Sequence, residues 1–249
     1  MKQLTLDLTW DASSGLDRFV AGANGMALAH LRQALAAPAL PQVPTYLWGG
    51  PGSGKTHLLQ AVRTALQQRG LQAGWLDATV PCSADAVPEF DPRWQAIVLD
   101  DVDRFDAAQQ HTAFNWFVHA QAPANGGGPL WVLAAGRLPV ADLTVREDLR
   151  TRLGWGQVLA LQLLSDAEVK QALQAAARHR GLDLGEEVVD YMQRRFARDT
   201  GSLMALLHML DEYALQNGRA ITIPLIRQML DETPQGVQAS AVQAPAVPH

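Results

Sequence analysis

Residues 49–56 have the sequence GGPGSGKT, which matches the pattern G-x-x-x-x-G-K-[ST] in full. Glycines let successive backbone N–H groups turn toward phosphate oxygens, and a following helix adds the positive end of its dipole. In such a loop Lys55 reaches the β- and γ-phosphates, and the Thr56 hydroxyl ligates magnesium. A plain glycine-rich turn would not require a Lys-Thr pair in this register. The segment therefore predicts a site for a nucleoside di- or triphosphate with Mg²⁺, formed by Gly50, Gly52, Ser53, Gly54, Lys55, Thr56 and the adjoining helix residue His57.

Two acids, Asp100 and Asp101, follow an apolar run at 97–99 downstream of the loop. Acids at a strand end are also common as solvated residues, but a phosphate loop upstream favours a functional role. We expect Asp100 to hold the magnesium, directly or through water, and Asp101 to orient or deprotonate an attacking water. Phosphoryl transfer depends mostly on positioning and charge stabilisation, so these residues suffice for binding but not for fast hydrolysis.

The elements that position these residues alternate in type up to about residue 164. Short apolar runs predict strands, and longer segments rich in alanine and leucine predict helices between them. This order is typical of an α/β fold with a parallel sheet covered on both faces. The expected strands are 45–48, 74–77, 96–99, 130–135 and 158–163, and the expected helices are 26–37, 55–69 and 107–122.

Beyond residue 164 the pattern becomes purely helical. Ser165 and Glu168 have the spacing of a capping box, in which each side chain bonds the backbone of the other residue. Four helices are expected, at 166–180, 186–197, 202–217 and 223–231. The predicted organisation is an extended arm over 1–14, a phosphate-loop α/β domain over 15–164, a small all-helical lid over 165–232 and a disordered tail over 233–249.

The composition limits the class of protein. The chain has 249 residues, 48% of them hydrophobic, which is enough for a folded core. Its net charge of −5 supplies no bulk field for nucleic acid, so any contact with DNA should be mainly indirect. A single cysteine, Cys82, excludes an intrachain disulfide and a multi-cysteine zinc site. Without a signal peptide or an apolar membrane-spanning run, the expected location is the cytoplasm, with no membrane partner.

An ATPase-type domain followed by a helical lid resembles the plan of AAA+ proteins, and four segments resemble the DnaA family in particular, including its shorter, Hda-type members. These segments are FVAGAN at 19–24, DDVDRF at 100–105, DLRTRLGWG at 148–156 and TIP at 222–224. The resemblance covers about residues 15–232. It implies that the nucleotide is ADP or ATP, and that Phe19 and Val20 lie near its adenine.

The same resemblance places Arg152 where the family has an arginine finger, a guanidinium that stabilises phosphoryl transfer in a neighbouring molecule. Arg150 is the nearest competitor for this role. The structural alternative is a surface arginine paired to Glu147 or Asp148.

The N-terminal arm resembles the hexapeptide with which Hda-type proteins bind the sliding clamp of DNA polymerase III. Gln3 would hydrogen-bond at the rim of a pocket, and Leu4, Leu6 and Leu8 would be its apolar anchors. Asp7 replaces the proline usual in that motif. The same alternation also fits an edge strand packed on its own domain.

Two positions depart from the family. The sensor position after the fourth strand, acidic in the relatives, aligns with Gly136, and the nucleotide-facing lid arginine aligns with Gly201. Arg198 is a candidate substitute for the second. Without these side chains we expect slow intrinsic hydrolysis, or a nucleotide held mainly as a structural ligand.

The resulting hypothesis is a regulator of replication initiation that binds adenine nucleotide and the clamp and stimulates ATP hydrolysis by DnaA. A homo-oligomer of the chain is a further possible assembly under this hypothesis. One alternative is an autonomous AAA+ ATPase such as a helicase loader. Another is a nucleotide-gated scaffold that recruits partners to the clamp without promoting chemistry.

Overall fold

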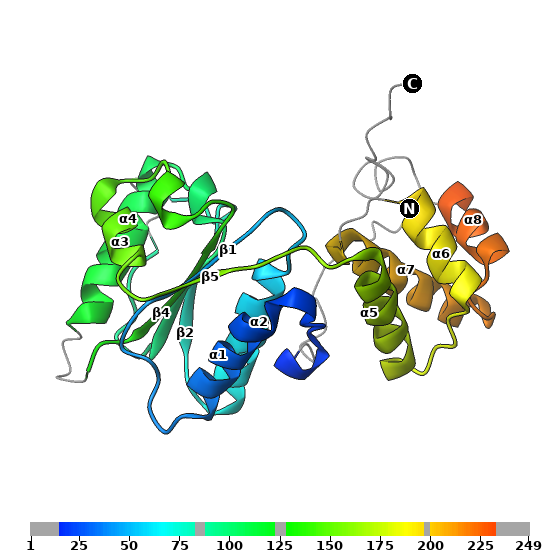
Figure 1. Ribbon diagram of the computed structural model, residues 1–249, viewed down its shortest axis with the longest axis horizontal. Coiled ribbons are helices and arrows are strands. Elements are labelled where there is room, and N and C mark those ends of the chain that lie inside the picture. The colour runs from blue at the N-terminus through cyan, green and yellow to red at the C-terminus, as the bar shows by residue number, and fades with distance from the viewer. Residues whose placement is uncertain (1–14, 83–87, 123–127, 197–199, 233–249) are drawn as a thin grey trace. The chain divides into compact units, whose positions relative to one another are not determined.

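The computed structural model describes residues 15–82, 88–122, 128–196 and 200–232 (Figure 1). The chain divides into two compact units, one comprising the residues up to Gly50 with Lys55–Leu161, the other Pro51–Gly54 with the residues from Gln162. The main division falls after Leu161 rather than after residue 164. The predicted arm over 1–14, the tail over 233–249 and Arg198 lie outside the described residues.

The first unit is built on a five-stranded sheet with the strand order β2-β3-β4-β1-β5. Every neighbouring pair is parallel, which confirms the predicted α/β class. β3 and β4 are fully buried, whereas β5 forms an edge with mostly exposed residues, and it is shorter than the predicted strand 158–163. The strands are β1 Thr45–Trp48, β2 Ala73–Leu76, β3 Ala96–Leu99, β4 Trp131–Gly136 and β5 Gln157–Ala160.

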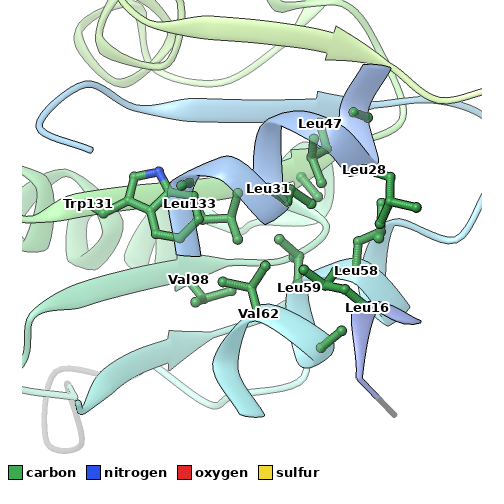
Figure 2. Packing of buried hydrophobic residues seen from close by; sticks show 14 of the residues in the cluster. Leu16, Leu28, Leu31, Leu47, Leu58, Leu59, Val62, Val98, Trp131 and Leu133 are labelled. Atoms are coloured by element: carbon green, nitrogen blue, oxygen red, sulfur yellow. The ribbon is translucent and has the colours of Figure 1, made fainter. Parts of the chain in front are cut away.

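Helices cover both faces of this sheet. On one face α1 (Gly25–Ala36) and α2 (Lys55–Gln68) pack against the strands, and Figure 2 shows Leu31 and Val62 among the strand residues of this core. On the other face α3 (Ala107–Gln121) and α4 (Glu147–Leu153) pack over a second apolar cluster. Short 3-10 helices join these elements at Leu16–Arg18, Gly22–Asn24, Val102–Arg104 and Val140–Asp142.

Helix α4 was not predicted from the sequence. Its seven residues are too few to show a helical period, and its two buried residues, Leu149 and Leu153, are its only apolar ones. They hold it against the second cluster of the core.

The second unit is the predicted helical lid. It contains α5 (Asp166–His179), α6 (Glu186–Arg195), α7 (Thr200–Asn217) and α8 (Ile223–Glu232), all around one apolar cluster. The predicted capping box is present: the Ser165 side chain accepts from the Glu168 N–H, and the Glu168 carboxylate accepts from the Ser165 N–H at 2.7 Å. Within the described ranges, no helix is long and apolar enough to cross a bilayer.

Gly156 explains why a glycine follows Trp155 at the start of β5. A Cβ at this position would collide with the backbone of Pro44, since the two backbone segments lie too close together for a side chain between them. This short distance between the segments allows a hydrogen bond at the next residue, in which the Gln157 N–H donates to the Pro44 carbonyl at 2.9 Å. Gly156 therefore lets β5 pair with β1 from its first residue onward.

Gly156→Ala should force β5 away from β1 and lower the free energy of unfolding by roughly 3 kcal/mol, the upper end of overpacking costs. Chemical denaturation of both proteins would measure this. Gly25→Ala is the matched control, since a Cβ there meets nothing within 4 Å and Gly25 lies in a helix. Equal stabilities of the Gly156→Ala and Gly25→Ala proteins would contradict the steric explanation.

Candidate functional site

The phosphate loop connects β1 to α2, and its backbone requires glycine at two positions. Gly52 and Gly54 have φ angles of 78° and 91°, a region in which residues with a Cβ are strained. Lys55 is the first residue of α2 and is buried, with its Nζ donating to the carbonyls of Gly49 at 2.8 Å and Gly50 at 3.0 Å. The ammonium is thus held over the loop that the sequence predicted.

Asp100 comes to the loop from the end of β3, as predicted. Asp100 is buried, with 4% of the residue exposed, and its carboxylate accepts hydrogen bonds from the Thr56 side chain and from the Asp101 N–H, the latter at 3.0 Å. Burial raises the pKa of Asp100 to about 6, and the charge of Asp101 adds to the rise, whereas the Thr56 hydrogen bond opposes it. Burying a charged carboxylate is unfavourable unless a cation or a proton balances its charge.

Thr56 and Asp100 fit a magnesium ion by chemistry. Mg²⁺ prefers oxygen ligands and usually takes only one or two from the protein, with the rest from phosphates and water. The pair supplies a hydroxyl and a carboxylate already in contact. No group of three or more His, Cys, Asp or Glu that could hold a metal occurs in the described part of the chain.

Asp101 has an unusual backbone. It is the only non-glycine residue with positive φ (53°) among those described, a conformation that costs an ordinary residue about 1 kcal/mol. Its carboxylate forms an ion pair with Arg104 at 3.2 Å. Such strain concentrates at functional sites. The role of Asp101 in orienting water stays a prediction.

The entry segment also reaches this region. The Phe19 ring stacks on His57 with 5.8 Å between centroids and an interplanar angle of 22°. Burial lowers the pKa of His57, which favours a neutral imidazole. Val20 follows Phe19 and is half-buried. The structure therefore brings Phe19 to the first turn of α2, next to the phosphate loop, and the adenine-side role of Phe19 and Val20 stays a prediction.

Arg152 is held by aromatic rings. Its guanidinium lies 5.2 Å from the Phe114 and Trp155 ring centroids and 5.8 Å from that of Phe117. None of the ion pairs among the described residues includes Arg152, since Asp148 pairs with Arg146 at 2.6 Å instead. The alternative of an Arg152 neutralised by Glu147 or Asp148 is therefore wrong. Cation–π contacts hold a guanidinium without cancelling its charge.

Three further positions from the sequence analysis are the competing arginine, Arg150, and the two glycines at the sensor positions, Gly136 and Gly201. Arg150 donates from Nη1 to the Leu143 carbonyl at 3.5 Å, a marginal contact. Gly201 is exposed in the first turn of α7. Gly136 is buried at the end of β4, where a Cβ would collide with the Tyr46 hydroxyl and lie 3.1 Å from Asp103 Oδ1.

Two features escaped sequence reasoning. The aromatic surroundings of Arg152 include Phe114 on α3, and the carboxylate near Gly136 belongs to Asp103, on the 3-10 helix after β3. Asp103 lies inside the DDVDRF segment, so its position could have been a signal. Its direction toward β4 could not have been read from the segment.

Comparison with known proteins supports a common origin over nearly the whole chain. A family model described as the lid domain of Hda matches residues 166–230, and one described as the bacterial DnaA ATPase domain matches residues 11–74. A Haemophilus influenzae protein described as uncharacterized is 32% identical over 241 residues, covering 92% of this chain and 99% of its own length.

Solved structures share the fold at low sequence identity. Domain III of Thermotoga maritima DnaA superposes with a TM-score of 0.69 at 17% identity, covering 88% of this chain and 96% of that one. AMPPCP-bound DnaA from Aquifex aeolicus gives 0.60 at 20% identity, covering 80% and 66%. A Thermotoga maritima RuvB mutant gives 0.60 at 18% identity, covering 88% and 72%.

The parallel sheet, the phosphate loop and the helical lid, together with the two family models, define a protein of the AAA+ class. The lid and the ATPase segment narrow the class further. The chain belongs to the DnaA family, and within it to the Hda-type proteins.

Asp100→Asn should stabilise the protein without nucleotide or metal at pH 7, by on the order of 1–3 kcal/mol, because it removes a buried charge. The pKa of Asp100 in the folded state lies above the ordinary 3.8, so a protonated Asp100 favours the folded state at low pH. The wild type loses that stability as pH rises from about 4 to about 6. The gain of the variant should grow over that window and stay constant above it. Thermal unfolding at several pH values measures it.

The same variant should lose the extra stabilisation that Mg²⁺ adds to nucleotide. Asp77→Asn is the contrasting control: at Asp77 burial is outweighed by hydrogen bonds from Thr79 and Trp75, its pKa is lowered, and the variant should be less stable at pH 7. A loss of stability in both variants would argue against a destabilising buried charge at Asp100.

Proposed function

We propose that this DnaA-related regulator of replication initiation binds an adenine nucleotide and the polymerase III sliding clamp, and stimulates hydrolysis of the ATP bound to DnaA. Arg152 acts in trans as the arginine finger. The observation that carries this proposal is the Arg152 guanidinium, held by three aromatic rings and paired with no carboxylate of the described residues.

The charge of Arg152 supports the proposed chemistry. The transferring phosphoryl group and its leaving oxygens carry negative charge, and an arginine finger raises the rate of hydrolysis by about 10³–10⁵. An arginine in an ion pair would first have to leave its carboxylate. Ring contacts restrict the guanidinium to a small region and leave its N–H groups available for phosphate oxygens.

The position of Arg152 supports action on another molecule. β1 and β5 are parallel, and Gln157, the first residue of β5, lies opposite Thr45, the first residue of β1. Helix α4 ends at Leu153, shortly before β5, so its end lies at the edge of the sheet where the strands begin. The phosphate loop follows Trp48, at the edge where the strands end. The two features of one chain therefore lie at opposite edges, and Arg152 is suited to the nucleotide of a neighbour.

The chain's own nucleotide, ADP or ATP with Mg²⁺, then has a structural role. Lys55 and the loop amides would hold its phosphates, and Thr56 with Asp100 would hold the metal, which neutralises phosphate charge. Glycine stands at both family sensor positions, Gly136 and Gly201. Slow intrinsic hydrolysis follows from this.

Arg152→Ala should reduce the stimulation of DnaA-bound ATP hydrolysis to the rate of DnaA alone, because the finger supplies most of the effect. The assay uses the full chain with clamp-loaded DNA and ATP-bound DnaA. Arg150→Ala is the matched control from the same helix and should retain most of the stimulation.

Retained stimulation by Arg152→Ala would contradict the mechanism and favour a scaffold that only recruits partners. Rapid hydrolysis by the wild-type protein alone, without any effect on DnaA, would favour the autonomous ATPase.

Gln3→Ala should abolish clamp binding, because the arm is proposed to place Gln3 at the pocket rim and leucines in apolar subsites. Clamp pulldown with the purified chain measures this. Thr5→Ala is the matched control, since Thr5 alternates with the anchors Leu4 and Leu6 and would face away. Undiminished clamp binding by Gln3→Ala would remove the arm from the proposal.

A further inference from the structure

At the end of β4, the Asp103 carboxylate lies next to Gly136. Gly136 is buried and has no room for a Cβ, because the Tyr46 hydroxyl, Asp103 Oδ1 and Val102 Cγ2 surround that point, the last two at 3.1 Å and 3.2 Å from it. Tyr46 is fixed in turn, since its hydroxyl donates to the Leu138 carbonyl at 2.7 Å. The space next to Gly136 thus contains the carboxylate of Asp103.

Asp103 holds the next residue of the chain, Arg137, by two contacts. The Arg137 N–H donates to Asp103 Oδ1 at 2.9 Å, and its Nε lies 3.6 Å from Oδ2. The Asp103 side chain is 11% exposed and that of Arg137 is 45% exposed. One partner is therefore an almost buried anchor, and the other presents its guanidinium to solvent.

This pair adjoins the phosphate loop. The Gly49 N–H donates to the Gly136 carbonyl at 3.2 Å, and Lys55 Nζ donates to the Gly49 carbonyl at 2.8 Å. These two hydrogen bonds connect Gly136 to Lys55 through Gly49, and Arg137 directly follows Gly136 in the sequence. The charges of Asp103 and Arg137 also shift the pKa of Lys55 in opposite directions, although burial is the largest influence on it.

We propose that Arg137 and Asp103 form a pair that distinguishes nucleoside triphosphate from diphosphate at the phosphate loop. Arg137 contacts the terminal phosphate, and Asp103 is the positioning residue that sets its backbone and guanidinium. This inference rests on the proposed nucleotide binding at the loop and names the residues that respond to the third phosphate.

The chemistry favours this division of roles. A guanidinium gives charge-assisted hydrogen bonds to phosphate, and the extra charge of a triphosphate strengthens them. Asp103 is an anion and would repel a phosphate, but its oxygens are turned to Arg137. The simple alternative is a structural ion pair joining the 3-10 helix Val102–Arg104 to β4. A half-exposed pair of that kind would affect stability slightly and nucleotide preference not at all.

The experiment measures dissociation constants of the full chain for ADP and for the non-hydrolysable analogue AMPPCP, both with Mg²⁺, by titration calorimetry. Arg137→Gln should weaken AMPPCP by about tenfold, the scale of one charge-assisted hydrogen bond, and leave ADP unchanged. Asp103→Ala should shift the preference in the same direction by a smaller factor. Asp103→Asn, which keeps an acceptor for the Arg137 N–H, should recover part of it.

Arg93→Gln is the matched control, an exposed arginine paired with Asp91 at 2.6 Å, and should leave the ratio of the two constants unchanged. Equal weakening of both nucleotides by Arg137→Gln, or an unchanged ratio with only a lower unfolding temperature, would overturn the inference and leave nucleotide binding intact. A wild-type chain that binds neither nucleotide would overturn the nucleotide part of the proposed function and this inference with it.

Discussion

The hydrogen bonds on the two sides of β1 connect the start of the phosphate loop, the Arg137 region and the chain that follows the Arg152 helix. β1 pairs with β4 on one side and with β5 on the other, in parallel registers that start at Thr45. Where β1 ends, the Gly49 N–H bonds to Gly136 and brings the end of β4 beside the loop. Where β1 begins, the Pro44 carbonyl accepts from Gln157 and ties down the chain that leaves α4. A four-residue strand thus fixes the loop, the Arg137 region and the Arg152 helix together.

The charges of the site are arranged around burial. Asp100 and Lys55 both lie out of water, and for both groups burial is the dominant influence on the pKa and disfavours the charged form. Such groups gain from a ligand that adds opposite charge next to them: magnesium for the carboxylate and phosphate for the ammonium. Arg152 follows a different principle, because its rings supply attraction without an anion.

Sequence reasoning succeeded where the relevant interactions are local. The loop glycines, the Lys-Thr pair and the Ser165 capping box each depend on residues within a few positions, and the structure shows that local geometry as expected. It failed where a contact joins distant segments. Gly136 suggested a missing carboxylate, yet Asp103 supplies one from another strand end, and no pattern within 100–105 shows which way that side chain turns. Short α4 was missed because packing, through Leu149 and Leu153, outweighs any periodicity.

The placement of Arg152 and the phosphate loop at opposite edges of the sheet also sets the symmetry of any association that uses them. Contact between the finger edge of one molecule and the loop edge of the next joins unlike surfaces, which makes it heterologous rather than two-fold. Repeated contacts of this kind generate a row with a direction, and a molecule joining its end does so by one edge only. A chain that engages through its finger edge keeps its own loop edge outward, so the polarity of the row continues through it.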